Sequence, residues 1–276
     1  MLNFFLKRFF DAFDRLDIWI DLHPGQEWVD TLPEKVTIDP VNVPYNPRWK
    51  YILRVLQPSA STLHFLRRML GVRISAQVAY VEIARDYPVR WKVDAQRLER
   101  YFLRTITMQY GPTQVTKHKN THYFGKPNAP RRLVTYSDRK SKLATAARGH
   151  RGLHTEVRLQ ETQLIERIGL GSIDALLAFD FSEFWATQIR YHSFGNRAAM
   201  GAALSRSACR DTGDSALQAR IRRALMSPKY TAGDAFVLQM LCRKRPSVTK
   251  ALLPMTAKAW LREAARVIAA PPREWP

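Results

Sequence analysis

The chain has 276 residues, with 44 Lys and Arg against 24 Asp and Glu, so its formal net charge is +20. Apolar residues make up 46% of the chain, which is enough to build a folded core and excludes general disorder. No run of about 18 uncharged apolar residues occurs, so we expect no transmembrane helix.

The cysteine content and the first residues bear on the compartment. Lys7 and Arg8 interrupt the apolar start, so we expect no secretion signal. Cys209 and Cys242 are the only cysteines, which excludes a disulfide framework and a cysteine-based zinc site. A cytoplasmic protein is therefore the expectation.

The positive charge is concentrated in two stretches. Residues 111–160 and residues 201–276 each carry a net charge of +9, whereas residues 1–50 carry −2. Two separate basic regions favour a polyanionic partner, with nucleic acid first and an acidic membrane surface second. No strongly basic amphipathic helix with a wide apolar face is evident, so we expect no membrane contact.

Hydrophobic periodicity predicts alternating strands and helices over most of the chain. The predicted strands are 13–22, 49–56, 77–89 and 153–159, together with a hairpin of 114–124 and 132–136. The predicted helices are 59–70, 94–110, 163–170 and 173–191, followed by 215–226, 232–242 and 256–269.

This order predicts an α+β fold in which helices pack on one mainly antiparallel sheet, followed by a smaller all-helical C-terminal region. We divide the chain into a domain of residues 1–195 and a basic helical region of residues 196–276. The helices at 232–242 and 256–267 could form a helix-turn-helix that contacts DNA, or a small bundle that packs on the sheet.

Acidic residues recur on the polar parity of three predicted strands. They are Asp17 and Asp21 on the first, Glu82 and Asp86 on the third, and Glu156 on 153–159. Carboxylates brought together by one sheet suggest a hard divalent cation, Mg²⁺ or Mn²⁺, which would let acidic groups lie beside a phosphodiester. Solvent exposure or ion pairing is the ordinary alternative for any one of them.

Tyr136 ends a predicted strand among cationic residues. A tyrosine hydroxyl has a usual pKa of about 10 and is a poor nucleophile, but nearby cations or a metal-polarised phosphate would help it attack phosphorus. His154, on the same face as Glu156, is a candidate ligand or general acid–base group. The candidate nucleic-acid contacts are Arg131, Arg132, Arg139, Lys140, Lys142 and Arg158.

The order of these motifs resembles the rolling-circle replication initiators, a family that includes plasmid initiators and the relaxases of conjugative elements. The matching pieces are RLDIWIDL (15–22) or YVEIARDY (80–87), THYFG (121–125), LVTYSDRKSK (133–142) and LHTEVRL (153–159). No His-apolar-His pair occurs, so the resemblance is to members that lack the two-histidine metal motif. The family's motif runs Tyr-Asp-Lys directly, whereas Ser137 follows Tyr136 here and Arg139 follows Asp138.

The resemblance implies a curved antiparallel sheet and an enzyme that nicks one strand of origin DNA to start rolling-circle replication or mobilisation. Tyr136 would be the nucleophile, and Lys140 or Lys142 would contact the phosphate. The implied ligands of the single divalent metal are Asp17 or Asp21, Glu82 or Asp86, and Glu156. The expected partner is origin DNA, single- or double-stranded, and a homodimer stays open.

Two other interpretations remain. A regulator on the same fold would bind DNA without metal-dependent cutting. An RNA-binding protein would stack bases on Trp19, Tyr80 and Tyr123. Acidic residues that gather around Tyr136 in space would favour the enzyme, and scattered ones would favour a binding protein.

Overall fold

The computed structural model describes seven stretches of the chain. They are residues 8–31, 36–42, 46–70, 74–110, 115–143, 149–193 and 253–269. No helix within these stretches is long and apolar enough to cross a lipid bilayer.

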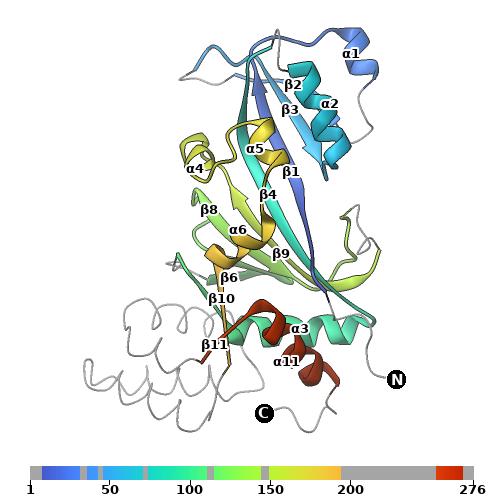
Figure 1. Cartoon of the computed structure of the whole chain (residues 1–276), viewed down its shortest axis with the longest axis vertical. Helices are drawn as coiled ribbons and strands as arrows, with labels where there is room; N and C mark the ends of the chain where they lie inside the picture. Colours follow the sequence, from blue (N-terminus) through green and yellow to red (C-terminus); the bar gives the residue numbers. More distant parts are fainter. Residues whose placement is uncertain are drawn as a thin grey trace, which may run out of the picture.

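One large antiparallel sheet organises the described residues (Figure 1). Its eight strands lie in the order β2, β3, β1, β4, β9, β8, β7, β6, and each neighbouring pair is antiparallel. Their bounds are β1 Phe10–Ile20, β2 Val36–Pro40, β3 Tyr51–Leu56, β4 Ala76–Val89, β6 Val115–His118, β7 Thr121–Phe124, β8 Arg131–Tyr136 and β9 Arg151–Leu159. The predicted α+β fold with a mainly antiparallel sheet is confirmed.

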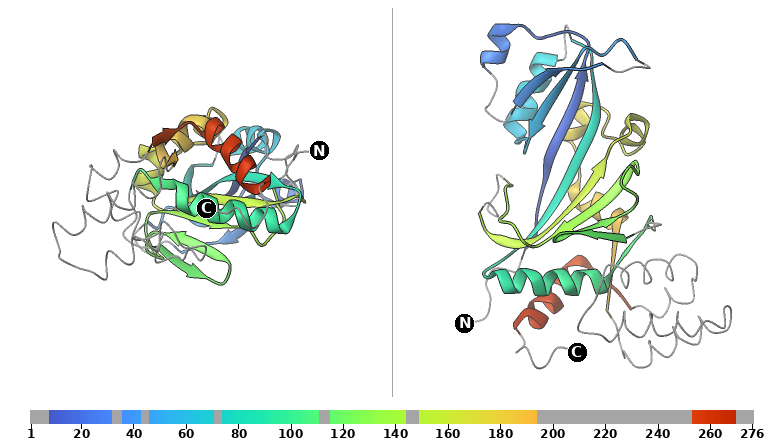
Figure 2. Two further views of the ribbon diagram at one scale, coloured as in Figure 1. Left: turned by 90° about the horizontal axis from the view of Figure 1, so that it is seen from below. Right: turned by 180° about the vertical axis from the view of Figure 1, so that it is seen from behind.

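Helices cover one face of this sheet and its lower end. Figure 1 shows α2, α4, α5 and α6 in front of the strands, with α3 and α11 across the bottom. Seen from behind, the long central strands carry no described helix (Figure 2). The helices are α1 Gln26–Asp30, α2 Ala60–Leu70, α3 Lys92–Thr105, α4 Thr162–Arg167, α5 Ile173–Leu177, α6 Phe181–Gln188 and α11 Ala257–Ala269.

The core forms where the apolar parity of the strands meets the apolar stripes of the helices. In β1, Leu16 and Ile18 are fully buried on the helix-covered face. Leu63, Leu66 and Leu70 of α2 recur at helical spacing and join the same cluster. The opposite parity of the central strands is thereby left free for polar side chains.

Two predicted helices end earlier than expected. The helix predicted over 94–110 stops at Thr105, and the β-branched Ile106 and Thr107 begin strand β5 (Ile106–Met108). The helix predicted over 173–191 is interrupted because Asp180 caps α6 by accepting hydrogen bonds from the Ser182 and Glu183 amides. Its last residues become β10 (Ile189–Ser193), which pairs with β5. Tertiary pairing therefore overrides helical periodicity at both ends.

The strand predicted over 114–124 is itself a hairpin. β6 pairs with β7 through Lys119, whose φ of +52° turns the chain, so the region supplies two strands at the sheet edge. Neither Gly nor Pro marks this turn, and this is why periodicity alone did not separate the strands.

The C-terminal helix predicted over 256–269 is confirmed as α11. The residues before it form β11 (Leu253–Met255), which pairs with β10, so the region expected to be all-helical also contains a strand. The helices predicted at 215–226 and 232–242 lie outside the described residues. The domain boundary between residues 195 and 196 stays a prediction.

Trp260 joins α11 to the rest of the core. Its side chain is 0% exposed, its ring stacks on Tyr101 at 5.5 Å, and it meets Tyr87 edge-on at 5.6 Å. The indole Nε1 donates to Thr105 Oγ1 at 2.8 Å. The aromatic contacts and this hydrogen bond together fix α11 against α3.

Replacing Trp260 with Ala should lower the free energy of unfolding by about 3–5 kcal/mol, because it leaves a large cavity and removes the hydrogen bond to the Thr105 hydroxyl. Urea unfolding followed by circular dichroism measures the loss. Trp91→Ala is the matched control, since Trp91 is 56% exposed, and it should cost about 1 kcal/mol or less. Equal losses for the two variants would contradict the packing of α11.

Candidate active site

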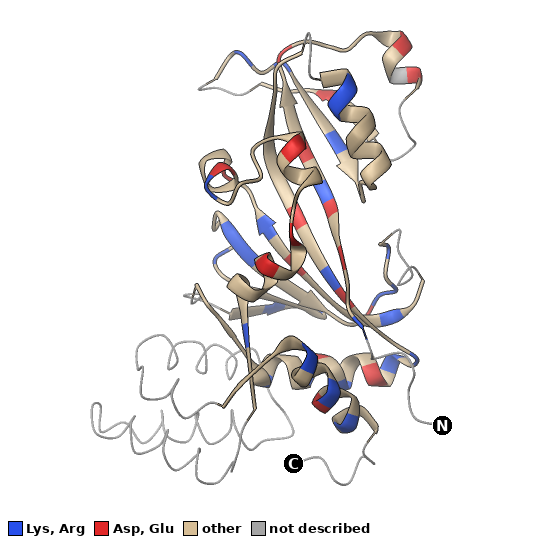
Figure 3. Ribbon diagram, viewed as in Figure 1, with Lys and Arg blue, Asp and Glu red and all other residues tan. Residues whose placement is uncertain are grey.

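Strand register places polar side chains in rows across β4, β9 and β8. Asp86 lies opposite His154, which in turn lies opposite Tyr136. Glu156, two residues after His154 in β9, pairs with Ala84 on one side and with Val134 on the other. Directly paired residues share a face, so these side chains gather on the face away from the helices. Figure 3 shows the resulting mixture of acidic and basic residues along the central strands.

Tyr136 and Glu156 are in direct contact. The Tyr136 hydroxyl donates to Glu156 Oε1 at 2.6 Å, and Glu156 is only 3% exposed. Arg158 Nη2 binds the other carboxylate oxygen, Glu156 Oε2, at 2.8 Å and fixes its orientation. Burial, together with the charge and hydrogen bond of Glu156, raises the pKa of the Tyr136 phenol well above its usual value of 10.0. The phenol is therefore protonated at rest, with a proton acceptor already in place.

Glu82 extends the cluster on the β1 side. Arg158 Nε lies 3.2 Å from Glu82 Oε1, so one guanidinium bridges Glu82 and Glu156. The Tyr80 hydroxyl also donates to Glu82 Oε1, at 2.6 Å. Burial and the charge of Glu156 raise the pKa of Glu82, although Arg158 opposes the shift. The ionised form of Glu82 is therefore disfavoured in this site.

His154 is held on both ring nitrogens. Nδ1 lies 2.9 Å from Asp86 Oδ1, and Nε2 lies 3.0 Å from the Arg139 carbonyl oxygen. Both partners are acceptors, so the ring serves them best as a doubly protonated imidazolium. Its ring stacks on Tyr136 at 5.1 Å between centroids. This placement gives His154 a positioning role beside the tyrosine, and its predicted catalytic role stays a prediction.

The segment after Tyr136 folds back over the acidic residues. The Ser141 hydroxyl donates to Asp86 Oδ2, and the Arg151 guanidinium donates to the Asp138 carbonyl at 3.1 Å. On the other side, the Ser137 hydroxyl donates to Glu99 Oε2 of α3 at 2.5 Å. Glu99, Ser141 and Arg151 were not singled out from the sequence, because each acts through a contact that only the tertiary fold creates.

Asp14 is the acidic neighbour that sequence periodicity missed. A bulge in the pairing of β1 with β4 falls between Phe13 and Arg15, so the strict alternation of faces breaks there. Asp14, together with Glu82 and Lys142, lines a cavity of about 470 Å³. Burial, followed by the charge of Glu156, raises the pKa of Asp14. Asp14 therefore belongs to the acidic cluster, although its parity pointed toward the core.

Asp17 and Asp21 lie apart from the cluster. Asp17 pairs with Arg15 at 2.5 Å and with Arg54 at 3.4 Å. Asp21 follows the end of β1 and accepts from the Ser75 amide at 2.8 Å. Hydrogen bonds with Ser75, the side-chain one first, lower the pKa of Asp21. Of the five predicted metal ligands, the structure brings Glu82, Asp86 and Glu156 around Tyr136.

The predicted nucleic-acid contacts divide between the two faces of the sheet. Arg132 and Arg158 lie opposite each other on the face of Tyr136, and the Arg139 guanidinium lies 5.2 Å from the Tyr136 ring centroid. Lys140 and Lys142 are exposed on the segment that follows. Arg131 has the opposite parity and packs over Tyr110 at 4.2 Å. The first five surround the candidate site, whereas Arg131 belongs to the helix-covered side.

The donor chemistry of the cluster suits a hard cation, but no closed cage is present. No group of three or more His, Cys, Asp or Glu within the described stretches is arranged to hold a metal ion. Mg²⁺ is commonly bound by one or two carboxylates, with waters and substrate phosphates completing its octahedron. Asp14, Glu82 and Glu156 are of the right type for such an open site.

Comparison with known proteins gives a distant structural likeness. No known protein family and no curated protein sequence matches the chain. Among solved structures, it is similar to a rolling circle replication initiator protein from Geobacillus stearothermophilus. The identity is 12%, the match covers 67% of this chain and 88% of that one, and the TM-score is 0.41. A likeness of this size does not decide function, which depends on the side chains of the site.

The Asp86–His154 pair makes stability depend on pH. Burial disfavours the imidazolium, but the hydrogen bond and charge of Asp86 outweigh it and raise the pKa of His154 above its usual 6.5. The pair therefore stabilises the fold fully below pH 6.5, and this contribution is lost as the pH rises through the raised pKa. In Asp86→Asn the pKa of His154 should fall, because the burial that disfavours the imidazolium is then no longer offset by the Asp86 carboxylate. NMR titration of the ring resonances measures it.

The control for this titration is Asp174→Asn on α5, where the replaced carboxylate is 66% exposed and lies in an ion pair with Arg67. That variant should leave the pKa of His154 unchanged. A pKa of His154 that stays the same in Asp86→Asn would contradict the ion pair.

Proposed function

We propose that the chain is a DNA-binding replication initiator that nicks one strand at an origin by transferring a phosphodiester to Tyr136. The observation that carries the proposal is the hydrogen bond from the Tyr136 hydroxyl to Glu156, a carboxylate oriented by Arg158. A nucleophile, its proton acceptor and a group that orients the acceptor form the arrangement expected for covalent catalysis. The motif order and the net charge of +20 support DNA as the substrate.

The proposed reaction exchanges one ester of phosphorus for another. Glu156 accepts the phenolic proton as the Tyr136 oxygen attacks phosphorus, and the bond from phosphorus to the 3′ oxygen breaks. Glu156 passes the phenolic proton on through solvent, and the 3′ oxygen takes up that proton as its bond to phosphorus breaks. The cut strand then has a free 3′ hydroxyl for a polymerase and a 5′ phosphotyrosine that stores the bond energy for rejoining.

A divalent cation would stabilise the ionised form of the buried carboxylates in this site. Burial and mutual repulsion raise the pKa values of Asp14 and Glu82, so their ionised forms are disfavoured in the resting protein. We infer that one or two of the carboxylates of Asp14, Glu82 and Glu156 would hold Mg²⁺ or Mn²⁺, with water and the DNA phosphate completing the coordination, since the described residues form no three-ligand cage. When bound, the ion would polarise the phosphate. Lys142, at the same cavity, lies where it could contact the next phosphate along the strand.

Tyr136→Phe should abolish the covalent protein–DNA adduct while DNA binding is retained, because only the hydroxyl is removed. Glu156→Gln should slow adduct formation by about 10²–10⁴-fold through loss of the proton acceptor. The assay incubates the protein with supercoiled DNA of its native replicon and Mn²⁺, digests with protease, and separates open circles on a gel.

Tyr123→Phe is the matched control for this assay, since Tyr123 lies on the neighbouring strand β7 opposite Val134. It should nick at the parent rate. Nicking by Tyr136→Phe would show that another residue is the nucleophile. Tight binding without cutting, on both supercoiled and single-stranded native DNA, would identify a non-catalytic regulator instead.

Removal of the metal should stop nicking. A chelator should abolish open-circle formation, and added Mn²⁺ should restore it. Asp14→Asn should raise the Mn²⁺ concentration needed for half-maximal nicking by about tenfold, because one ligand charge is lost. Asp21→Asn, away from the cluster, should leave that concentration unchanged. A metal requirement that is the same in Asp14→Asn and the parent would exclude Asp14 as a ligand.

A further inference from the structure

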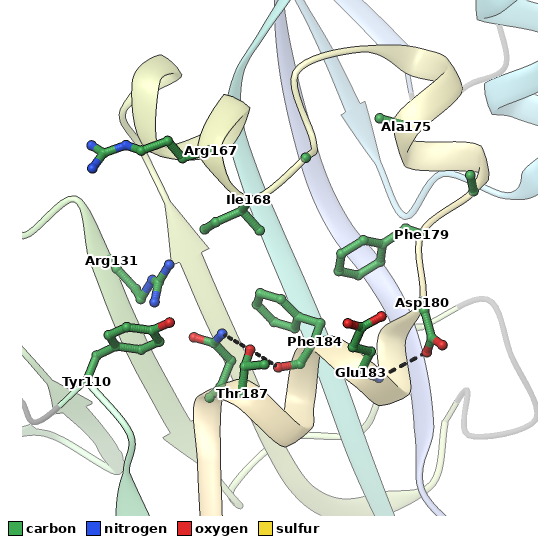
Figure 4. Close-up of a pocket in the computed structure, with 13 residues that line it drawn as sticks. Tyr110, Arg131, Arg167, Ile168, Ala175, Phe179, Asp180, Glu183, Phe184 and Thr187 are labelled. Carbon is green, nitrogen blue, oxygen red and sulfur yellow. Dashed lines mark hydrogen bonds between the residues drawn. The ribbon is translucent and has the colours of Figure 1, made fainter.

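A second cavity lies on the helix-covered side of the sheet, away from Tyr136. Its volume is about 490 Å³, within the range of small-molecule sites, and its walls come from α4, α5, α6 and the first residue of β8 (Figure 4). Arg131 faces this cavity, whereas Tyr136, five residues along the same strand, belongs to the opposite face. A ligand bound here would not touch the tyrosine.

Gln188 lines the cavity with an unused hydrogen-bond acceptor. The residue is 2% exposed, and its Nε2 donates to Thr187 Oγ1 at 2.8 Å. The Thr187 hydroxyl donates to the Phe184 carbonyl at 2.7 Å, so it accepts from Gln188 and fixes which amide atom is the oxygen. Gln188 Oε1 is then buried without a hydrogen-bond partner among the described residues. A buried amide oxygen without a partner is unfavourable unless a ligand donates to it.

Arg131 supplies the complementary donor and a flat surface. Its Nε is also buried without a hydrogen-bond partner in the described stretches, although its guanidinium packs on the Tyr110 ring at 4.2 Å. Figure 4 shows the guanidinium above Tyr110 and pointing toward the centre of the cavity, with Phe179 and Phe184 on the far side. Guanidinium planes and aromatic rings are the surfaces on which nucleobases stack.

Charge is divided across this cavity. Arg131 and Arg167 lie on one side, and Asp180 and Glu183 lie on the other (Figure 4). A phosphate would be attracted to the arginine side and repelled from the carboxylates, which can accept from amino or hydroxyl groups. A small molecule that suits both sides of the cavity therefore has an anionic group at one end and hydrogen-bond donors at the other.

We propose that this cavity binds a nucleotide. Its base would stack beside Arg131 and donate to Gln188 Oε1, and its phosphate would lie toward the Arg131 guanidinium. A nucleotide combines the three features required here: a planar ring, donors and acceptors on the ring edge, and an anionic group. The ligand is either a free nucleotide or one nucleotide of a single strand, and the site is independent of the chemistry at Tyr136.

The test is calorimetric titration of the full chain with dAMP, dCMP, dGMP and dTMP, and then with single-stranded tetranucleotides. At least one mononucleotide should bind at one site per chain. Gln188→Leu should weaken it about tenfold, since one buried hydrogen bond is lost. Ala175→Leu, which fills the cavity from α5, should abolish binding, whereas Ala186→Leu on the exposed side of α6 should not change it. Circular dichroism checks that each variant is folded.

Three results would overturn the proposal: no mononucleotide binds, inorganic phosphate competes as well as the nucleotide, or Ala175→Leu binds like the parent. A tetranucleotide that binds more tightly than its mononucleotide, and loses that advantage in Ala175→Leu, would identify a base of a strand as the ligand. Equal affinities would identify a free nucleotide. Tyr136→Phe should bind mononucleotides like the parent, so failure of the nickase proposal and failure of this one give different results.

Discussion

The bridge that Arg158 makes between Glu82 and Glu156 is the contact on which the rest of the site depends. Both carboxylates are buried, and a buried carboxylate is tolerated only when it is paired and hydrogen-bonded. Arg158 satisfies this condition for both and leaves Glu156 Oε1 free to accept from Tyr136. The same guanidinium therefore compensates the burial of two acids and aims one of them at the tyrosine.

This bridge requires the correct register between two strands, β4 and β9. A one-residue shift of β9 against β4 would carry His154, Glu156 and Arg158 to the helix-covered face, where their charges would be buried without partners. The apolar parity of β4 and β9 prevents that shift, because Ile83 and Val157 must stay in the core. Packing of the apolar core therefore fixes the strand register, and the register in turn positions the polar side chains of the site.

The sequence predicted the elements and the polar parity of the central strands, because both follow from period-two alternation. It therefore indicated Glu82, Asp86 and Glu156 together with Tyr136, and the structure brings these four together. It could not exclude Asp17, whose partner Arg54 comes from β3, nor include Asp14, which reaches the site through a bulge. Bulges and cross-strand partners depend on register between distant segments, which local periodicity does not specify. The helices that end at Thr105 and Gln188 were predicted too long for the same reason, since the chain leaves each helix to form the paired strands β5 and β10.

The raised pKa of Tyr136 sets a requirement on how the site can act. A buried phenol beside a carboxylate holds its proton more firmly than a free one, so the geometry alone does not produce a strong nucleophile. Added positive charge near Glu156 would reverse this effect. The Arg139 guanidinium at the Tyr136 ring supplies part of that charge in the resting protein. In the proposed nickase the remainder would come from a divalent cation that binds with the DNA, which would link activation of the tyrosine to the presence of its substrate. In its absence the same electrostatics would keep the phenol protonated and inactive.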